Sequence, residues 1–119
     1  RYDVMAQYMQ SLRQIYREEA GKLKASLDAK SLKALKRWLA RDAEDLPEQE
    51  RQRYVAALEK SSRLSLGVEM RRELVSLWQR STATHAELLA RLQDWCRRAE
   101  ASGIRQLEEF SSRLRSYAL

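Results

Sequence analysis

Apolar residues recur every three or four positions along most of the chain, which is the spacing that places them on one face of an α-helix. In the first such stretch these residues are Met5, Tyr8, Leu12, Ile15, Tyr16, Leu23 and Leu27. Interruptions are few, since the sequence holds only three glycines and one proline, and helix formers such as Leu, Ala, Arg and Glu are abundant. The pattern therefore predicts an all-α fold, a compact bundle of about five to six helices.

Polar residues mark the expected starts of the second and third helices. Ser31 is a candidate N-cap for a helix whose apolar positions are Leu32, Leu35, Trp38 and Leu39. Asp45 and Glu48 have the spacing of a capping box, and Pro47 lies where its missing N–H does no harm. This stretch predicts a third helix that runs to about Lys60.

The second half of the chain leaves the position of Gly67 open but marks its later helix boundaries. Gly67 either ends a turn or lies inside a fourth helix. The Thr84 hydroxyl can accept a hydrogen bond from the N–H of Glu87, which predicts the start of a fifth helix. Ser102 and Gly103 follow it as a corner, in which Gly103 takes the left-handed conformation that ends a helix. The expected core of helices five and six includes Leu92, Trp95, Cys96, Leu107 and Phe110.

Length and composition limit the class of protein. The 119 residues suit one helical domain over residues 1–119, and a start at Arg rather than Met indicates a piece of a longer chain. No window approaches 18 apolar residues and no signal peptide is evident, so we expect no membrane span. A single cysteine cannot form an internal disulfide, which agrees with a reducing compartment.

Several residues are of types that could react or bind a ligand, and for each we favour a structural role. Cys96 lies on an apolar stripe, whose burial raises a thiol pKa, so we expect a packed core thiol and not a nucleophile. His85 is the only histidine and is expected to be a solvated first-turn residue. Trp38, Trp78 and Trp95 stand at helical spacing beside leucines, which predicts core packing over base stacking or ligand binding.

No recognisable catalytic motif occurs in the sequence. It has no Glu-x-x-His pairing, no glycine-rich phosphate loop, no G-x-S-x-G and no H-E-x-x-H. We therefore expect this chain to be non-catalytic, with no catalytic, cofactor-binding or metal-binding residue of its own.

The positive charge is concentrated in one segment. Residues 22–41 contain seven Lys and Arg against one Asp, a net charge of +6 that equals that of the whole chain. The candidate contact residues for an anionic partner are Lys30, Lys33, Lys36, Arg37 and Arg41. Such a helix can meet anionic lipid headgroups or nucleic-acid phosphates, or it can be a solvated face.

Much of the chain resembles the C-terminal extension of bacterial membrane fatty-acid desaturases. The likeness is strongest from Leu74 onwards, in "LVSLWQRSTATHAELLARLQDWCRRAEASGIRQLEEFSSRLRSYAL". "RYDVMAQYMQSLRQIYREE" is similar to the segment that leads into that extension, and "LKRWLARD" with "SSRLSLGVEMRRELVSLWQRS" fits its middle.

The desaturase resemblance implies a cytoplasmic helical appendage of an integral membrane enzyme. The parent would be a diiron acyl desaturase of lipid metabolism, with iron held by histidine boxes that this chain lacks. The implied partners are the parent's membrane domain or an anionic membrane surface, and the basic helix would dock there. The resemblance implies nothing about the oligomeric state.

A second and weaker resemblance is to the helical C-terminal end of some insertion-sequence transposases. It rests on an "LW" helix, a "W-x-x-x-A" helix and a final "SGI-x-x-L-x-x-F" helix. It implies that the partner is nucleic acid, that the basic segment contacts DNA phosphates, and that the acidic DDE residues lie elsewhere. The two resemblances therefore predict different partners for the same basic helix.

Overall fold

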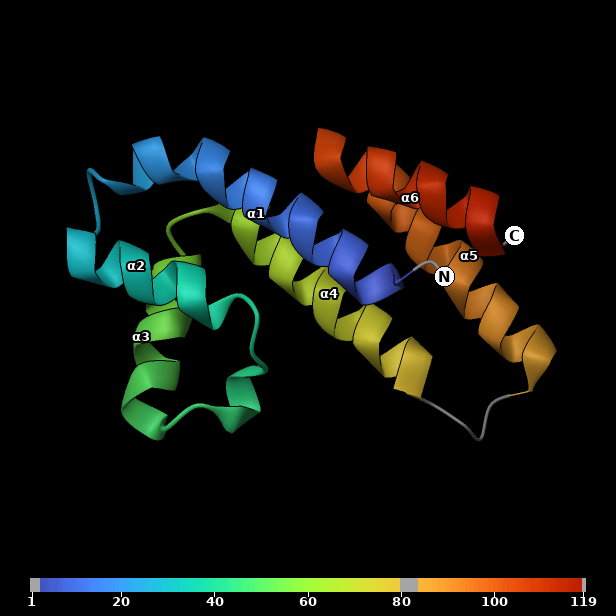
Figure 1. The fold of residues 1–119 in the computed structure, drawn as a ribbon, viewed down its shortest axis with the longest axis horizontal. Coiled ribbons are helices and arrows are strands. Elements are labelled where there is room, and N and C mark those ends of the chain that lie inside the picture. The colour runs from blue at the N-terminus through green and yellow to red at the C-terminus, as the bar shows by residue number, and fades with distance from the viewer. Residues whose placement is uncertain (1–2, 80–83, 119) are drawn as a thin grey trace. The chain divides into compact units, whose positions relative to one another are not determined.

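The computed structural model describes residues 3–79 and 84–118 (Figure 1). Within these residues the chain forms α-helices and one short 3-10 helix, without a strand, so the predicted all-α class is confirmed. The elements in order are α1 (Val4–Leu23), α2 (Ala29–Trp38), η1 (Ala43–Asp45), α3 (Glu48–Leu58), α4 (Ser62–Gln79), α5 (His85–Glu100) and α6 (Arg105–Ala118).

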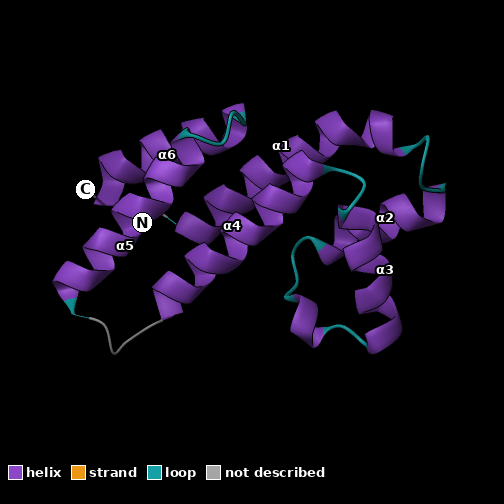
Figure 2. Cartoon of the chain, turned by 180° about the vertical axis from the view of Figure 1, so that it is seen from behind, coloured by secondary structure: helices purple, strands orange, loops and turns teal. Residues whose placement is uncertain are grey.

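The chain divides into two compact units. Unit 1 comprises Arg1–Ser11 and Glu69–Leu119, and unit 2 comprises Leu12–Val68. Helices α1 and α4 each contribute residues to both units. Helices α5 and α6 pack against each other as a hairpin in unit 1, and α2 packs against α3 in unit 2 (Figure 2).

The core of unit 1 is built around three aromatic rings from three helices. Tyr8, Trp95 and Phe110 meet edge to face, with ring centroids 5.0–5.9 Å apart. The buried Trp95 indole N–H donates a hydrogen bond to the carbonyl oxygen of Met70 at 2.9 Å. Trp78 belongs to α4, but its side chain lies outside the described residues. The predicted core positions are confirmed as buried for Leu92, Trp95, Cys96, Leu107 and Phe110.

The corner between α5 and α6 has the geometry that the sequence predicts. Gly103 has φ 75°, a left-handed conformation that favours glycine. The Ser102 hydroxyl donates to the Ala99 carbonyl oxygen at 2.6 Å and accepts from the Ile104 N–H at 3.1 Å. Together these two residues end α5 and turn the chain into α6.

The helix N-termini confirm one predicted cap and correct two. Thr84 caps α5, since its hydroxyl accepts from the Glu87 N–H at 3.1 Å. The cap of α2 is Asp28 and not Ser31, because the chain turns helical earlier and Ser31 supplies the N–H that Asp28 accepts. In α3 the flanking position is Pro47, without a side-chain cap, and Asp45 belongs to the preceding 3-10 helix.

Unit 2 is held by contacts of α1 with α2, of α1 with α4 and of α2 with α3. The Tyr16 hydroxyl donates to the Leu32 carbonyl oxygen at 2.9 Å. Gly67 lies inside α4, where an added Cβ would be 2.8 Å from Leu12 Cδ1, so glycine permits this close approach. The rings of Trp38 and Tyr54 lie 5.8 Å apart between α2 and α3. These contacts fix the buried side of α2.

Two glycine substitutions should change stability in opposite directions. Gly103→Ala is expected to destabilise the chain by about 1 kcal/mol, because alanine is strained in the left-handed region. Gly21→Ala, in an exposed helical position with open space around it, should stabilise the chain by about 0.5–1 kcal/mol. Urea unfolding of both variants measures this, and the same sign for both would contradict the assigned backbone conformations.

Candidate functional site

Helix α2 has one buried and one basic side. Its buried residues are Leu32, Ala34, Leu35 and Trp38. All five basic residues singled out from the sequence are exposed, four on α2 and one just after it: Lys30, Lys33, Lys36, Arg37 and Arg41. The buried set and the basic set occupy opposite sides at helical spacing, so packing of the apolar side turns the cations toward solvent.

None of these five side chains forms an ion pair with another described residue. By contrast, most arginines of the described part of unit 1 are held by carboxylates. The pairs are Arg72–Glu69, Arg97–Asp94, Arg98–Glu73, Arg98–Asp94, Arg105–Glu109 and Arg115–Glu100. The charge of α2 is therefore uncompensated at short range, whereas much of the positive charge of unit 1 is neutralised locally.

The ends of α2 match the direction of the helix dipole. Asp28 at the N-terminus accepts from the Ser31 N–H at 2.7 Å, and this hydrogen bond, together with one involving the Ser31 side chain, holds its pKa below the usual value. Lys36 and Arg37 lie in the last turn, where the partial negative charge of the carbonyl groups favours cations. Lys36 and Arg37 thus stabilise the helix through its dipole. Lys30 and Lys33 lie outside the last turn and have no such role.

The structure adds one basic residue that the sequence analysis missed. Arg53 of α3 is exposed, and its guanidinium carbon lies 5.5 Å from the centroid of the Trp38 ring. The positive charge thus extends from α2 to the adjoining helix. Its sequence neighbourhood, "EQERQRY", gave no sign of this because it contains equal numbers of acidic and basic residues.

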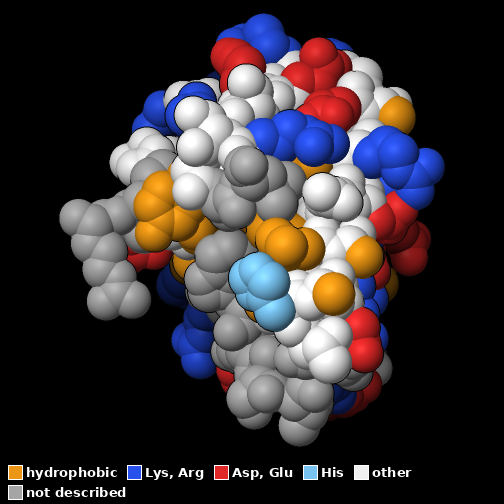
Figure 3. All heavy atoms as spheres, turned by 90° about the vertical axis from the view of Figure 1, so that its right-hand side faces the viewer, with side chains coloured by type: hydrophobic (Ala, Val, Ile, Leu, Met, Phe, Trp, Pro, Cys, Tyr) orange, Lys and Arg blue, Asp and Glu red, His pale blue; other side chains and the backbone are white. Residues whose placement is uncertain are grey.

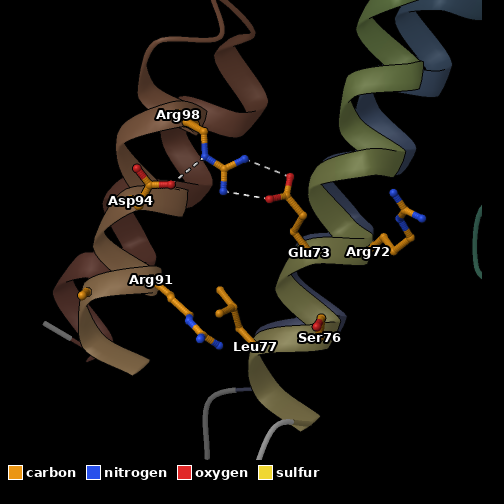
Figure 4. Close-up of a pocket in the computed structure, with 8 residues that line it drawn as sticks. Arg72, Glu73, Ser76, Leu77, Arg91, Asp94 and Arg98 are labelled. Atoms are coloured by element: carbon orange, nitrogen blue, oxygen red, sulfur yellow. Dashed lines mark hydrogen bonds and ion pairs between the residues drawn. The ribbon is translucent and has the colours of Figure 1, made fainter. Parts of the chain in front are cut away.

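A cleft of about 690 Å³ lies between α4 and α5 in unit 1. It is lined partly by arginines, but Arg98 is held between Glu73 at 2.8 Å and Asp94 at 2.9 Å (Figure 4). Arg91 extends from α5 toward Leu77 of α4 in the same view. Because Arg98 pairs with two carboxylates of the cleft and Arg72 pairs with Glu69, the cleft holds fewer unpaired cations than α2.

His85 and Cys96, the two other candidate reactive residues, have the environments that the sequence predicts. His85 is exposed at the start of α5, on a face where acidic and basic side chains lie side by side (Figure 3). Cys96 is fully buried, and burial raises the pKa of its thiol. Among the described residues, no group of three or more His, Cys, Asp or Glu could hold a metal ion. No helix in the described part of the chain is long and apolar enough to cross a bilayer.

Comparison with known proteins decides between the two resemblances. A family model described as transposase, that of the ISL3-type DDE transposases, matches residues 1–119. The chain belongs to this transposase family. No curated protein and no solved structure matches it. The family match supports the weaker resemblance, to insertion-sequence transposases.

The desaturase interpretation has no support from these comparisons. The diiron parent, the role in lipid metabolism and the membrane partner all depended on that resemblance, and none of them is retained for this transposase chain. The helix formers that it shared with the desaturase extension occur in many helical proteins. The basic surface of α2, which did not depend on the resemblance, is retained as the candidate site.

Proposed function

We propose that this helical part of an ISL3-type transposase binds DNA through the exposed basic side of α2. In this proposal Lys30, Lys33, Lys36, Arg37 and Arg41 contact backbone phosphates. The chain supplies DNA binding and not chemistry, and the acidic DDE residues of the transposase lie elsewhere.

The observation that carries the proposal is the uncompensated charge of α2. Residues 29–41 contain no acidic residue, and their five cations have no carboxylate partner among the described residues. A duplex carries one phosphate per about 3.4 Å of each strand, and Lys30 and Arg37 are separated by a helical rise of about 10 Å. The basic side of α2 is therefore long enough to meet several phosphates.

Three of the four basic residues of α2 are lysines, which favours phosphate contacts over paired hydrogen bonds to bases. The helix has no Asn or Gln, the side chains that pair with adenine through two hydrogen bonds. Lysine ammonium groups bind phosphates as point charges, and such contacts position a protein without specifying sequence. We therefore expect α2 to bind duplexes of different sequence with similar affinity.

Neutralising two central cations should weaken DNA binding and flatten its salt dependence. Lys33→Gln with Arg37→Gln is expected to reduce affinity for a short duplex about tenfold at about 0.1 M salt. The slope of log affinity against log salt should fall by about 1.8, because each phosphate that the protein no longer neutralises lowers it by about 0.9. Fluorescence anisotropy titrations between about 50 and 200 mM salt measure both quantities.

The matched control removes the same charge from unit 1. Arg97→Gln with Arg105→Gln neutralises two exposed arginines that already pair with Asp94 and Glu109, so affinity should change little. Equal losses in both double variants would show that only net charge matters and would contradict a site on α2. Binding to anionic vesicles with no duplex binding at the same salt would also contradict the proposal.

A further inference from the structure

Arg53 lies over a tryptophan that both neighbouring helices hold in place. Trp38 is only 2% exposed, and its indole N–H donates to Glu50 Oε1 at 3.2 Å. The ring of Tyr54 lies 5.8 Å from the Trp38 ring. Trp38 belongs to α2, whereas Glu50 and Tyr54 belong to α3. These contacts therefore hold the indole where the two helices meet.

The guanidinium of Arg53 is placed by this ring and not by an ion pair. Its carbon lies 5.5 Å from the Trp38 centroid, within the range of a cation–π contact. Among the described residues it has no carboxylate within ion-pair distance, whereas Arg51 on the same helix pairs with Glu48. The charge of Arg53 nevertheless contributes to lowering the pKa of Asp28, after the hydrogen bonds of Ser31. This interaction places Arg53 within electrostatic reach of the N-terminal end of α2.

We infer that Arg53 is a further phosphate-binding residue, which extends the DNA interface from α2 onto α3. This inference rests on the proposed function of α2. A guanidinium held over an aromatic face by a cation–π contact still has N–H groups that can donate two parallel hydrogen bonds to one phosphate. Because the contact with Trp38 already restricts the Arg53 side chain, binding orders it less than it would order an arginine without such a contact.

The charge of Asp28 allows a second test of this interface. Its carboxylate is exposed at the cap of α2 and within electrostatic reach of both Arg53 and Lys30, so it opposes an anionic ligand there. Asparagine caps a helix about as well as aspartate. Asp28→Asn therefore removes the opposing charge without removing the cap.

Binding of a short duplex by the 119-residue chain tests the inference. Arg53→Gln is expected to reduce affinity about three- to fivefold and to lower the salt slope by about 0.9. Arg53→Lys keeps the charge but loses the planar fork, so the slope should persist while affinity falls about twofold. Asp28→Asn should raise affinity about twofold, because it removes a charge that repels phosphate.

Arg51→Gln is the matched control, since it removes one charge from the same helix at a position that Glu48 already neutralises. Its affinity and slope should stay near those of the unchanged chain. Equal effects of Arg53→Gln and Arg51→Gln, while Lys33→Gln with Arg37→Gln still weakens binding, would overturn the role of Arg53 alone. Absence of duplex binding by the unchanged chain would overturn the proposed function and this inference together.

Discussion

Replacing Trp95 with alanine is expected to destabilise unit 1 by about 3–5 kcal/mol, the usual effect of truncating a buried aromatic residue. The indole is fully buried and meets the rings of Tyr8 and Phe110 at 5.9 and 5.7 Å. Its N–H also donates to the Met70 carbonyl oxygen at 2.9 Å. Alanine would leave a cavity at the point where α1, α4, α5 and α6 meet. Urea unfolding followed by circular dichroism measures the loss.

Trp95→Phe separates the two contributions of the indole. Phenylalanine keeps an aromatic ring beside Tyr8 and Phe110 but has no N–H to donate to Met70, so we expect a loss of about 1–2 kcal/mol. An alanine variant less stable by under about 1 kcal/mol would contradict the packing of the unit 1 core. A phenylalanine variant as unstable as the alanine variant would assign most of the effect to the hydrogen bond.

Local features of the sequence were sufficient to predict the helices and much of their packing. Apolar spacing identified Trp95, Cys96 and Phe110 as core residues, and all three are fully buried. A Ser-Gly pair and a Thr-x-x-Glu pattern located the α5–α6 corner and the start of α5. These signals act over a few residues, so they can be read without knowledge of the fold.

Features that depend on tertiary structure could not be predicted in this way. Arg53 joins the candidate site only because α3 packs against α2 and places its guanidinium over Trp38. Likewise, the ion pair of Arg98 with Glu73 links residues that are far apart in the sequence. The basic run around Lys33 was visible in the sequence, but only the structure shows that Lys33 has no described carboxylate within ion-pair distance.

A buried carboxylate in unit 2 is the second feature on which we expect stability to depend strongly. Glu19 of α1 is 6% exposed, and it accepts hydrogen bonds from the Ser61 hydroxyl at 2.7 Å and from Arg63 at 2.8 Å. Burial by itself would raise the pKa of Glu19, but these hydrogen bonds and the charges of Lys22 and Arg63 outweigh it and lower the pKa. Glu19 thus joins α1 to the start of α4 in its ionised form.

Glu19→Gln is expected to destabilise unit 2 by about 2 kcal/mol at neutral pH, because the buried hydrogen bonds then lack a charged acceptor. The folded-state pKa lies below the ordinary Glu value of 4.5, so the contribution of Glu19 is complete above that value. It is lost as the pH falls through the lowered pKa, and the stability curves of the two proteins should converge at acid pH.

Glu18→Gln is the control, since Glu18 also pairs with Arg63 but its side chain is 41% exposed, and it should change stability by less than about 1 kcal/mol. A difference between Glu19→Gln and the unchanged chain that stays constant from neutral to acid pH would show that Glu19 does not act through its charge.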